Sequence, residues 1–201
     1  MPRFNKLVLM VASAAATLFG ALPAFASAAM PIGGVTSQPI GHYEFCESHH
    51  AECSVRSSDT NPARLTNYGW STIERINLAV NASVEPMTDD ELYGRDEVWA
   101  YPDSGAGDCE DFVLEKRRRL MKAGLPASDL LITVVRKPNG EGHAVLTLRT
   151  TKGDYILDNL NDIILPWTET PYTYLKRQAS FDSGRWVKIE TGTDLPVAAL
   201  R

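Results

Sequence analysis

Three residues of this sequence could together perform nucleophilic catalysis: a cysteine, a histidine and an aspartate that follow one another along the chain. Cys109 lies in the segment GDCEDF, at the start of an expected helix. A cysteine reacts as a thiolate, and a helix N-terminus together with a nearby imidazolium favours that form. Cys109 is therefore a candidate nucleophile, His143 its candidate base, and Asp158 the group that would orient the imidazole.

The strand pattern predicts that the last two of these side chains can meet. The segments HAVLTLR and DYILDNL are typical of strands, and a two-residue turn at Thr151-Lys152 would join them. In that register His143 pairs with Leu160, and Asp158 lies two residues along on the same face. Such diagonal neighbours are about 7–8 Å apart, within reach of a hydrogen bond between the side chains.

Each of the three residues also has a purely structural interpretation. Cys109 could be a buried thiol without chemistry, His143 could simply begin a strand, and Asp158 could be a turn residue or a cap. Their order along the chain and the elements that carry them together favour catalysis.

Three carboxylates surround the candidate nucleophile. Asp108, Glu110 and Asp111 place negative charge beside the thiol, which opposes formation of a thiolate. As N-cap and first-turn residues they also suit the helix dipole. A hard cation such as Ca²⁺, bound through these oxygens, would remove the electrostatic penalty. The three residues are therefore candidate metal ligands, and capping is the alternative.

The elements that must position these residues indicate an α+β fold. The expected helices and strands, read from hydrophobic periodicity and turn signals, are a helix over 68–82, a short helix within 87–99, a helix from 109 ended by Gly124, strands at 130–136, 143–149 and 154–160, and β-rich stretches around 172–175 and 186–189. A helical first half and an antiparallel second half predict N-terminal helices packed on an antiparallel β-sheet.

Residues 1–28 read as a secretory signal. Arg3 and Lys6 precede an uncharged stretch rich in Ala and Leu from Leu7 to Leu22, and small-residue cleavage sites follow Pro23. A retained membrane anchor is the competing interpretation, but the apolar stretch is short and interrupted. We therefore expect a periplasmic protein with no stable membrane insertion after signal cleavage.

The bulk composition fits one globular domain that does not bind nucleic acid. The chain has 201 residues, of which 44% are hydrophobic and 22% charged. Without Arg3 and Lys6, its 20 basic residues fall to 18 against 25 acidic ones, a net charge of about −7. Because phosphate binding needs a basic face, nucleic acid is excluded as a partner.

The three cysteines predict one disulfide and one free thiol. In an oxidising compartment we expect Cys46 and Cys53 to pair, which leaves Cys109 as a reactive thiol. His49 and His50 lie between the pair, so a zinc or haem site is an alternative. In one continuous helix the two cysteines would be about 10 Å apart, too far for a disulfide, whereas a bend would permit it.

Four segments resemble the bacterial transglutaminase-like cysteine proteinase family: GDCEDF, TVVR, GHAVL and LDN. The resemblance covers about residues 68–177 and implies a papain-like, transglutaminase-like fold. It implies a catalytic triad of Cys109, His143 and Asp158. It also implies calcium dependence, with Asp108 and Glu110 as ligands that flank the nucleophile; Asp111 is a further candidate ligand.

The resemblance further implies a periplasmic endopeptidase that acts on a protein substrate such as a large surface adhesin, with an inner-membrane receptor as regulatory partner. An acyltransferase of the transglutaminase type with the same triad is one alternative, and a catalytically silent calcium-binding interaction module is another. The expected organisation is a signal peptide at 1–28, an N-terminal arm with the Cys46–Cys53 loop at 29–66, and the proteinase domain at 67–201.

Overall fold

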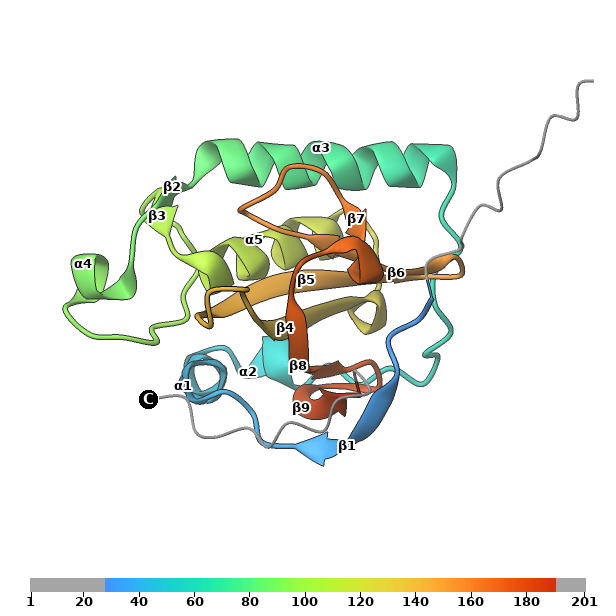
Figure 1. Cartoon of the computed structure of the whole chain (residues 1–201), viewed down its shortest axis with the longest axis horizontal. Helices are drawn as coiled ribbons and strands as arrows, with labels where there is room; N and C mark the ends of the chain where they lie inside the picture. Colours follow the sequence, from blue (N-terminus) through green and yellow to red (C-terminus); the bar gives the residue numbers. More distant parts are fainter. Residues whose placement is uncertain (1–27, 191–201) are drawn as a thin grey trace, which may run out of the picture.

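A seven-stranded antiparallel sheet forms the centre of the structure, a computed structural model that describes residues 28–190 (Figure 1). The expected signal peptide lies outside the described residues, except for Ala28. In spatial order the strands are β1 (Ile32–Thr36), β9 (Asp182–Ile189), β8 (Thr173–Ala179), β4 (Leu130–Arg136), β5 (Gly142–Thr150), β6 (Gly153–Leu157) and β7 (Leu165–Pro166).

Helices pack on this sheet: α5 lies on β4 and β5, and α3 packs against α5. The helices are α1 (Ile40–Ser48), α2 (His50–Cys53), α3 (Asn67–Ser83), α4 (Asp89–Tyr93) and α5 (Cys109–Lys122). A separate parallel pair joins β2 (Glu85–Pro86) to β3 (Ala106–Gly107) just before α5. The α+β class and the packing of helices on an antiparallel sheet are therefore as the sequence predicts.

The two faces of the sheet bury different clusters, because alternate residues of a strand point to opposite faces. Ile132 and Leu146 join Phe112 and Ile73 in the main core between the sheet and the helices. A smaller cluster on the other side includes Val135 and Val145, and its remaining members are Met30, Ile156, Tyr174 and Ile189. This two-sided burial fixes the register of the central strands.

The helix boundaries follow local signals. Thr66 caps α3 by accepting a hydrogen bond from the N–H of Gly69 at 3.1 Å. Thr88 caps α4 in a reciprocal capping box with Glu91. Gly124, with a φ of 99°, follows the end of α5 in the left-handed conformation that glycine adopts most readily.

The segment 29–66, expected as an arm, contributes a strand to the sheet and a helix that packs on it. β1 pairs with β9 at one edge of the sheet, and α2 packs against β9. Within residues 28–190 none of the helices combines the length and apolar character needed to cross a bilayer.

Candidate active site and cation site

Cys109 begins α5, directly after the short strand β3. Asp108 occupies the N-cap position with an extended backbone (φ −103°, ψ −162°), although its side chain makes no capping hydrogen bond within the described part of the chain. The first N–H groups of a helix lack partners inside the helix, so they and the helix dipole favour negative charge at this end. Helix geometry at Cys109 therefore favours a thiolate.

The thiol of Cys109 lies against the first residues of β5. The backbone N–H of Ala144 donates to Sγ at 3.4 Å, and the thiol donates to Oε2 of Glu110 at 3.1 Å. Cys109 is outside the disulfide. Since His143 directly precedes Ala144, β5 carries the candidate base into the neighbourhood of the candidate nucleophile.

His143 is paired with Asp158. The distance between Nε2 and Oδ1 is 2.9 Å, and the two residues are only 6% and 4% exposed. The β5–β6 register is the one that a two-residue turn predicts, with Thr150 opposite Gly153. β6 ends at Leu157, so the expected pairing of His143 with residue 160 does not form. The Asp158 carboxylate nevertheless reaches the imidazole of His143.

Tyr172 completes the surroundings of Asp158, and no sequence signal marks it apart from its place one residue before β8. Its hydroxyl donates to Oδ2 of Asp158, while the N–H of Leu160 donates to Oδ1 at 3.0 Å. Burial would raise the pKa of Asp158, but hydrogen bonds and charge from His143, together with the hydrogen bond from Tyr172, hold this pKa below its usual value. The carboxylate therefore stays ionised at neutral pH and can orient the imidazole.

The carboxylates around Cys109 oppose the effect of the helix N-terminus and disfavour the thiolate. Burial, followed by the negative charges of Glu110 and Asp108, raises the pKa of the Cys109 thiol well above its usual value. The hydrogen bond from Ala144 only partly opposes this. A thiolate at this position therefore needs additional positive charge nearby.

Three aspartates form a cluster that could supply the ligands for such a charge. One carboxylate oxygen each from Asp89, Asp108 and Asp111 lies within 4.8 Å of the others. The backbone N–H groups of Val98 and Ala100 donate to Oδ2 of Asp89 (2.6 Å) and Oδ1 of Asp111 (2.8 Å). The remaining oxygens, together with Oδ1 of Asp108, are buried without a hydrogen-bond partner among residues 28–190.

The electrostatics of this cluster fit a hard divalent cation. Burial, with the charges of neighbouring carboxylates, raises the pKa of Asp111 to about 7 and that of Asp108 to about 9. Burial also raises the pKa of Asp89. Three clustered carboxylates, each with one unpartnered oxygen, are ligands of the kind that Ca²⁺ prefers. The residues present therefore fit calcium.

The structure sorts the predicted metal ligands into two groups. Asp108 and Asp111 lie in the cluster of three aspartates, whereas Glu110 contacts the thiol and forms a second possible ligand group with Asp108 and Cys109. Asp89 was not predicted. It lies 20 residues before Cys109 in the sequence, in the capped first turn of α4, where an acidic residue already has an explanation as a dipole partner.

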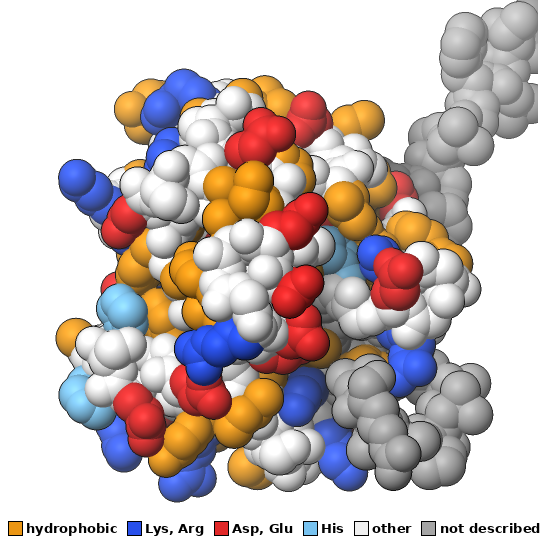
Figure 2. Space-filling model, turned by 90° about the vertical axis from the view of Figure 1, so that its left-hand side faces the viewer, with side chains coloured by type: hydrophobic (Ala, Val, Ile, Leu, Met, Phe, Trp, Pro, Cys, Tyr) orange, Lys and Arg blue, Asp and Glu red, His pale blue; other side chains and the backbone are white. Residues whose placement is uncertain are grey.

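The face of the molecule that carries α4 and the start of α5 is shown in Figure 2, with acidic side chains along its middle. A hollow of about 370 Å³ is lined by α1 and by the segment that includes Val98 and Ala100. Aromatic rings of Phe45 and Tyr101 contribute to its lining, next to the charged Arg95. The aspartates of the cluster thus hold the backbone of a segment that forms one wall of the hollow.

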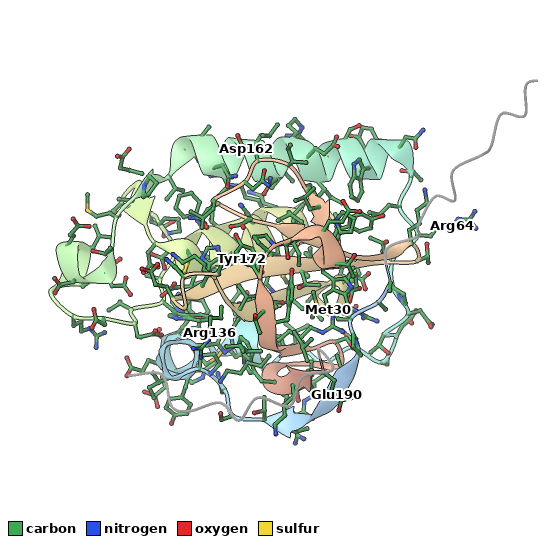
Figure 3. The ribbon with its side chains drawn as sticks, viewed as in Figure 1. Met30, Arg64, Arg136, Asp162, Tyr172 and Glu190 are labelled. Carbon is green, nitrogen blue, oxygen red and sulfur yellow. A yellow bond between two sulfur atoms is a disulfide. The ribbon has the colours of Figure 1, made fainter. Side chains whose placement is uncertain are left out.

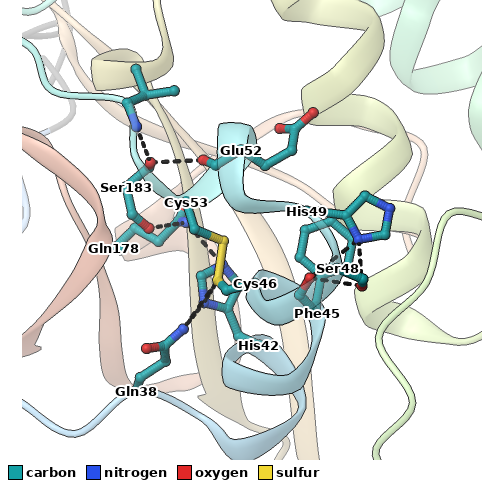
Figure 4. Close-up of a disulfide and its surroundings, with 12 residues drawn as sticks. Gln38, His42, Phe45, Cys46, Ser48, His49, Glu52, Cys53, Gln178 and Ser183 are labelled. Carbon is teal, nitrogen blue, oxygen red and sulfur yellow. Dashed lines mark hydrogen bonds between the residues drawn. A yellow bond between two sulfur atoms is a disulfide. The ribbon is translucent and has the colours of Figure 1, made fainter.

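Cys46 and Cys53 form a disulfide, as the sequence predicts, with 5.6 Å between their Cα atoms (Figure 4). The required bend is the break between α1 and α2 at His49 (φ −124°, ψ 51°). His42 lies beside the disulfide, and Nδ1 is 3.6 Å from Sγ of Cys46. Burial, and then the charge of Arg117, lowers the pKa of His42 to about 3, so this imidazole is neutral.

A thiol at a helix N-terminus beside a hydrogen-bonded histidine–aspartate pair, on helices packed against an antiparallel sheet, is an arrangement that suits cysteine peptidases and acyltransferases of the transglutaminase type. The family is the bacterial transglutaminase-like cysteine proteinase family (BTLCP), whose sequence model matches residues 32–194, and the chain belongs to it. The match extends well beyond the four segments that first suggest it.

Solved structures of LapG from Legionella pneumophila share the fold. The calcium-bound form is 23% identical, with 65% of this chain and 74% of that chain covered and a TM-score of 0.52. The EGTA-treated form is 21% identical, with 79% and 82% covered and a TM-score of 0.51. No match was found among curated protein sequences.

Proposed function

We propose that this chain is a calcium-dependent endopeptidase of the periplasm in which Cys109, His143 and Asp158 form the catalytic triad. The observation that carries the proposal is the position of Cys109: its thiol contacts the start of β5, the strand that bears His143, and His143 is paired with Asp158. The calcium-bound form of the LapG relative supports the cation, and the apolar, uncharged stretch near the N-terminus supports export.

The reaction begins with a proton transfer within the triad. His143 takes the thiol proton of Cys109, and Asp158 stabilises the resulting imidazolium. The thiolate attacks the scissile carbonyl, and the backbone N–H of Cys109 donates to the developing oxyanion. His143 then protonates the leaving amine. It next removes a proton from water, which attacks the thioester and releases the acid.

Asp89, Asp108 and Asp111 would hold the calcium ion in this proposal. When bound, the ion supplies positive charge that cancels the carboxylates beside the thiol and favours the thiolate. Through their second oxygens, Asp89 and Asp111 also hold the wall of the hollow beside α1, where an extended polypeptide substrate could bind. The family resemblance points to a large surface adhesin as that substrate and to an inner-membrane receptor as regulator.

Alkylation of Cys109 tests the chemistry without a known substrate. We expect iodoacetamide to modify Cys109 well below pH 8 in Ca²⁺, and much more slowly in EGTA, because the thiolate forms only when the carboxylates are neutralised. His143→Gln should slow the reaction in Ca²⁺. If Cys109 reacts as an ordinary thiol near pH 8.5 under both conditions, the peptidase proposal is wrong and a calcium-binding module is favoured.

Product analysis separates hydrolysis from acyl transfer. The chain is incubated with a library of protein fragments in Ca²⁺, with or without glycine ethyl ester as an amine acceptor, and products are read by mass spectrometry. Endopeptidase activity predicts fragments with a new C-terminal carboxylate, and these fragments should be absent with Cys109→Ala. Products that carry the added amine in place of water would identify an acyltransferase.

A further inference from the structure

The loop that carries Asp158 is attached to α3 by two asparagines. Nδ2 of Asn81 donates to the backbone carbonyl of Asp158 at 2.9 Å and to Oδ1 of Asp162 at 2.8 Å. Nδ2 of Asn77 donates to the backbone carbonyl of Asp162 at 3.0 Å. The two asparagines are four residues apart and so share one helix face. Figure 3 shows Asp162 next to α3.

Only one of these attachments reaches Asp158 itself. Asn81 contacts both ends of the five-residue loop from Asp158 to Asp162, whereas Asn77 contacts only the far end. A hydrogen bond to the carbonyl of a residue fixes the position from which its side chain extends. Asn81 therefore anchors the backbone from which the Asp158 carboxylate extends to His143.

A buried lysine lies near the same loop. Lys116 is on α5, seven residues and about two turns after Cys109, so the two residues share a helix face. Its side chain is 0% exposed, and its Nζ has no hydrogen-bond partner within the part of the chain that the structure describes. Burial lowers the pKa of Lys116 to about 7, and the charges of Asp158 and Asp162 oppose this lowering.

Besides the Lys116 ammonium group, several hydrogen-bond acceptors near the loop also lack partners among the described residues. The amide oxygens of Asn77, Asn81 and Asn159 are buried without hydrogen-bond partners among residues 28–190. An ammonium group has three N–H donors, and ordered water commonly joins such groups in protein interiors. A buried charge without compensation is strongly destabilising. The charges of Asp158 and Asp162 favour the charged form of Lys116, against the larger effect of burial.

We propose that Asn81 and Lys116 are positioning residues for Asp158: Asn81 holds its backbone, and the Lys116 ammonium counters its charge from inside the core. The inference rests on the proposed role of Asp158 in the triad. Neither residue touches the reacting atoms. Both act through the carboxylate, so their effect should vanish when that carboxylate is absent.

A double-mutant cycle tests this dependence. Asn81→Leu and Lys116→Met are near-isosteric changes, and each is made alone and with Asp158→Asn. The rate constant for alkylation of Cys109 by iodoacetamide is measured in Ca²⁺ at about pH 6, where Lys116, with a pKa of about 7, is mainly charged. We expect each change to lower the rate about tenfold alone and less than about twofold beside Asp158→Asn, because residues in one network do not act additively.

Asn77→Leu is the matched control, since it removes a similar bond from the same helix without touching Asp158. It should lower the melting temperature but change the alkylation rate by less than about twofold. A spectroscopic readout accompanies the rates: the downfield NMR signal of the His143 Nε2 proton, assigned by its loss in Asp158→Asn, should shift in Asn81→Leu and Lys116→Met but not in Asn77→Leu.

The outcomes separate the inference from the function on which it rests. Equal rate losses with and without Asp158→Asn, or an equal loss in Asn77→Leu, would show a general effect on the fold and overturn the inference. An unchanged His143 signal in both Asn81→Leu and Lys116→Met would also overturn it. If Asp158→Asn alone leaves alkylation unchanged, the proposed triad itself is wrong.

Discussion

At the scale of single residues, Asp158 is the point on which several elements converge. His143 reaches it from β5 and Tyr172 from the residue before β8, while the N–H of Leu160 comes from its own loop. These donors explain why a buried carboxylate keeps a pKa below its usual value. Loss of one donor should therefore reduce the power of the carboxylate to orient the imidazole.

Tyr172→Phe tests this expectation. Removal of the hydroxyl takes away a hydrogen bond to a charged group, typically about 1.5–3 kcal/mol. We expect alkylation of Cys109 in Ca²⁺ to slow by about tenfold while the fold is retained. Tyr174→Phe is the matched control, because its hydroxyl bonds Thr170 and not Asp158. Equal effects of the two changes would contradict a role for Tyr172.

Asp89→Asn tests the cation site. Loss of one ligand charge should weaken Ca²⁺ binding by about tenfold or more, since ligand charge tunes affinity. It should also stabilise the EGTA-treated protein, because it removes charge from a crowded buried cluster. Asp90→Asn on the same helix is exposed and should change neither property. Calcium titrations followed by thermal unfolding would measure both, and an unchanged affinity would exclude Asp89 as a ligand.

At the scale of elements, the short strand β3 sets the position of the first turn of α5. A Cβ at Gly107 would lie 2.5 Å from Oδ2 of Asp111 and 2.7 Å from its Cβ. Only glycine allows the strand to approach the aspartate this closely. β3 therefore keeps Asp111 in the cluster with Asp89, although α4 and α5 are separated by a long loop.

Gly107→Ala should displace Asp111. Overpacking of this kind typically costs about 1–3 kcal/mol, and the displaced carboxylate should bind Ca²⁺ more weakly. Gly142→Ala at the start of β5 is the control, because a Cβ there meets no atom within 4 Å among the described residues. Urea unfolding in EGTA and calcium titration provide the measurements. If both alanine variants have the same stability and calcium affinity as the unaltered chain, the close contact between Gly107 and Asp111 does not contribute to either property.

At the scale of the whole molecule, we expect the aspartate cluster to couple the stability of the protein to pH and to calcium. The pKa values of Asp111 (about 7) and Asp108 (about 9) lie above their unfolded value near 3.8. A carboxyl with a raised folded-state pKa stabilises the fold below the unfolded pKa, and this stabilisation is lost as pH rises through the folded pKa. Without calcium, these two groups should therefore destabilise the protein progressively from about pH 4 to pH 9.

Calcium should reverse this trend. Because the ligands must lose their protons to bind the ion, stabilisation by calcium should grow with pH. We expect the difference in melting temperature between Ca²⁺ and EGTA to be larger at pH 8 than at pH 5. Asp111→Asn should flatten this dependence. A difference that stays constant across this range in the unaltered chain would contradict proton–cation competition in the cluster.

Local patterns in the sequence determined most of the elements that surround the site. The helix expected over 68–82 forms as α3, Cys109 begins α5, and the segment 130–136 forms β4 over the predicted residues. The β5–β6 register followed from a two-residue turn, because strand alternation then fixes which side chains share a face. The spacing of Cys46 and Cys53 similarly required a bend, and the structure has one.

Only the tertiary structure decided which distant groups join these elements. Asp89 joins the aspartate cluster because the loop between α4 and β3 brings α4 close to the start of α5. No periodicity in the sequence encodes the path of that loop. Tyr172 and Asn81 reach Asp158 from elements far apart in sequence. Short-range patterns fix the type and register of an element, whereas such contacts depend on how the elements pack. The sequence alone therefore supports the triad as a prediction but does not identify the groups that hold it.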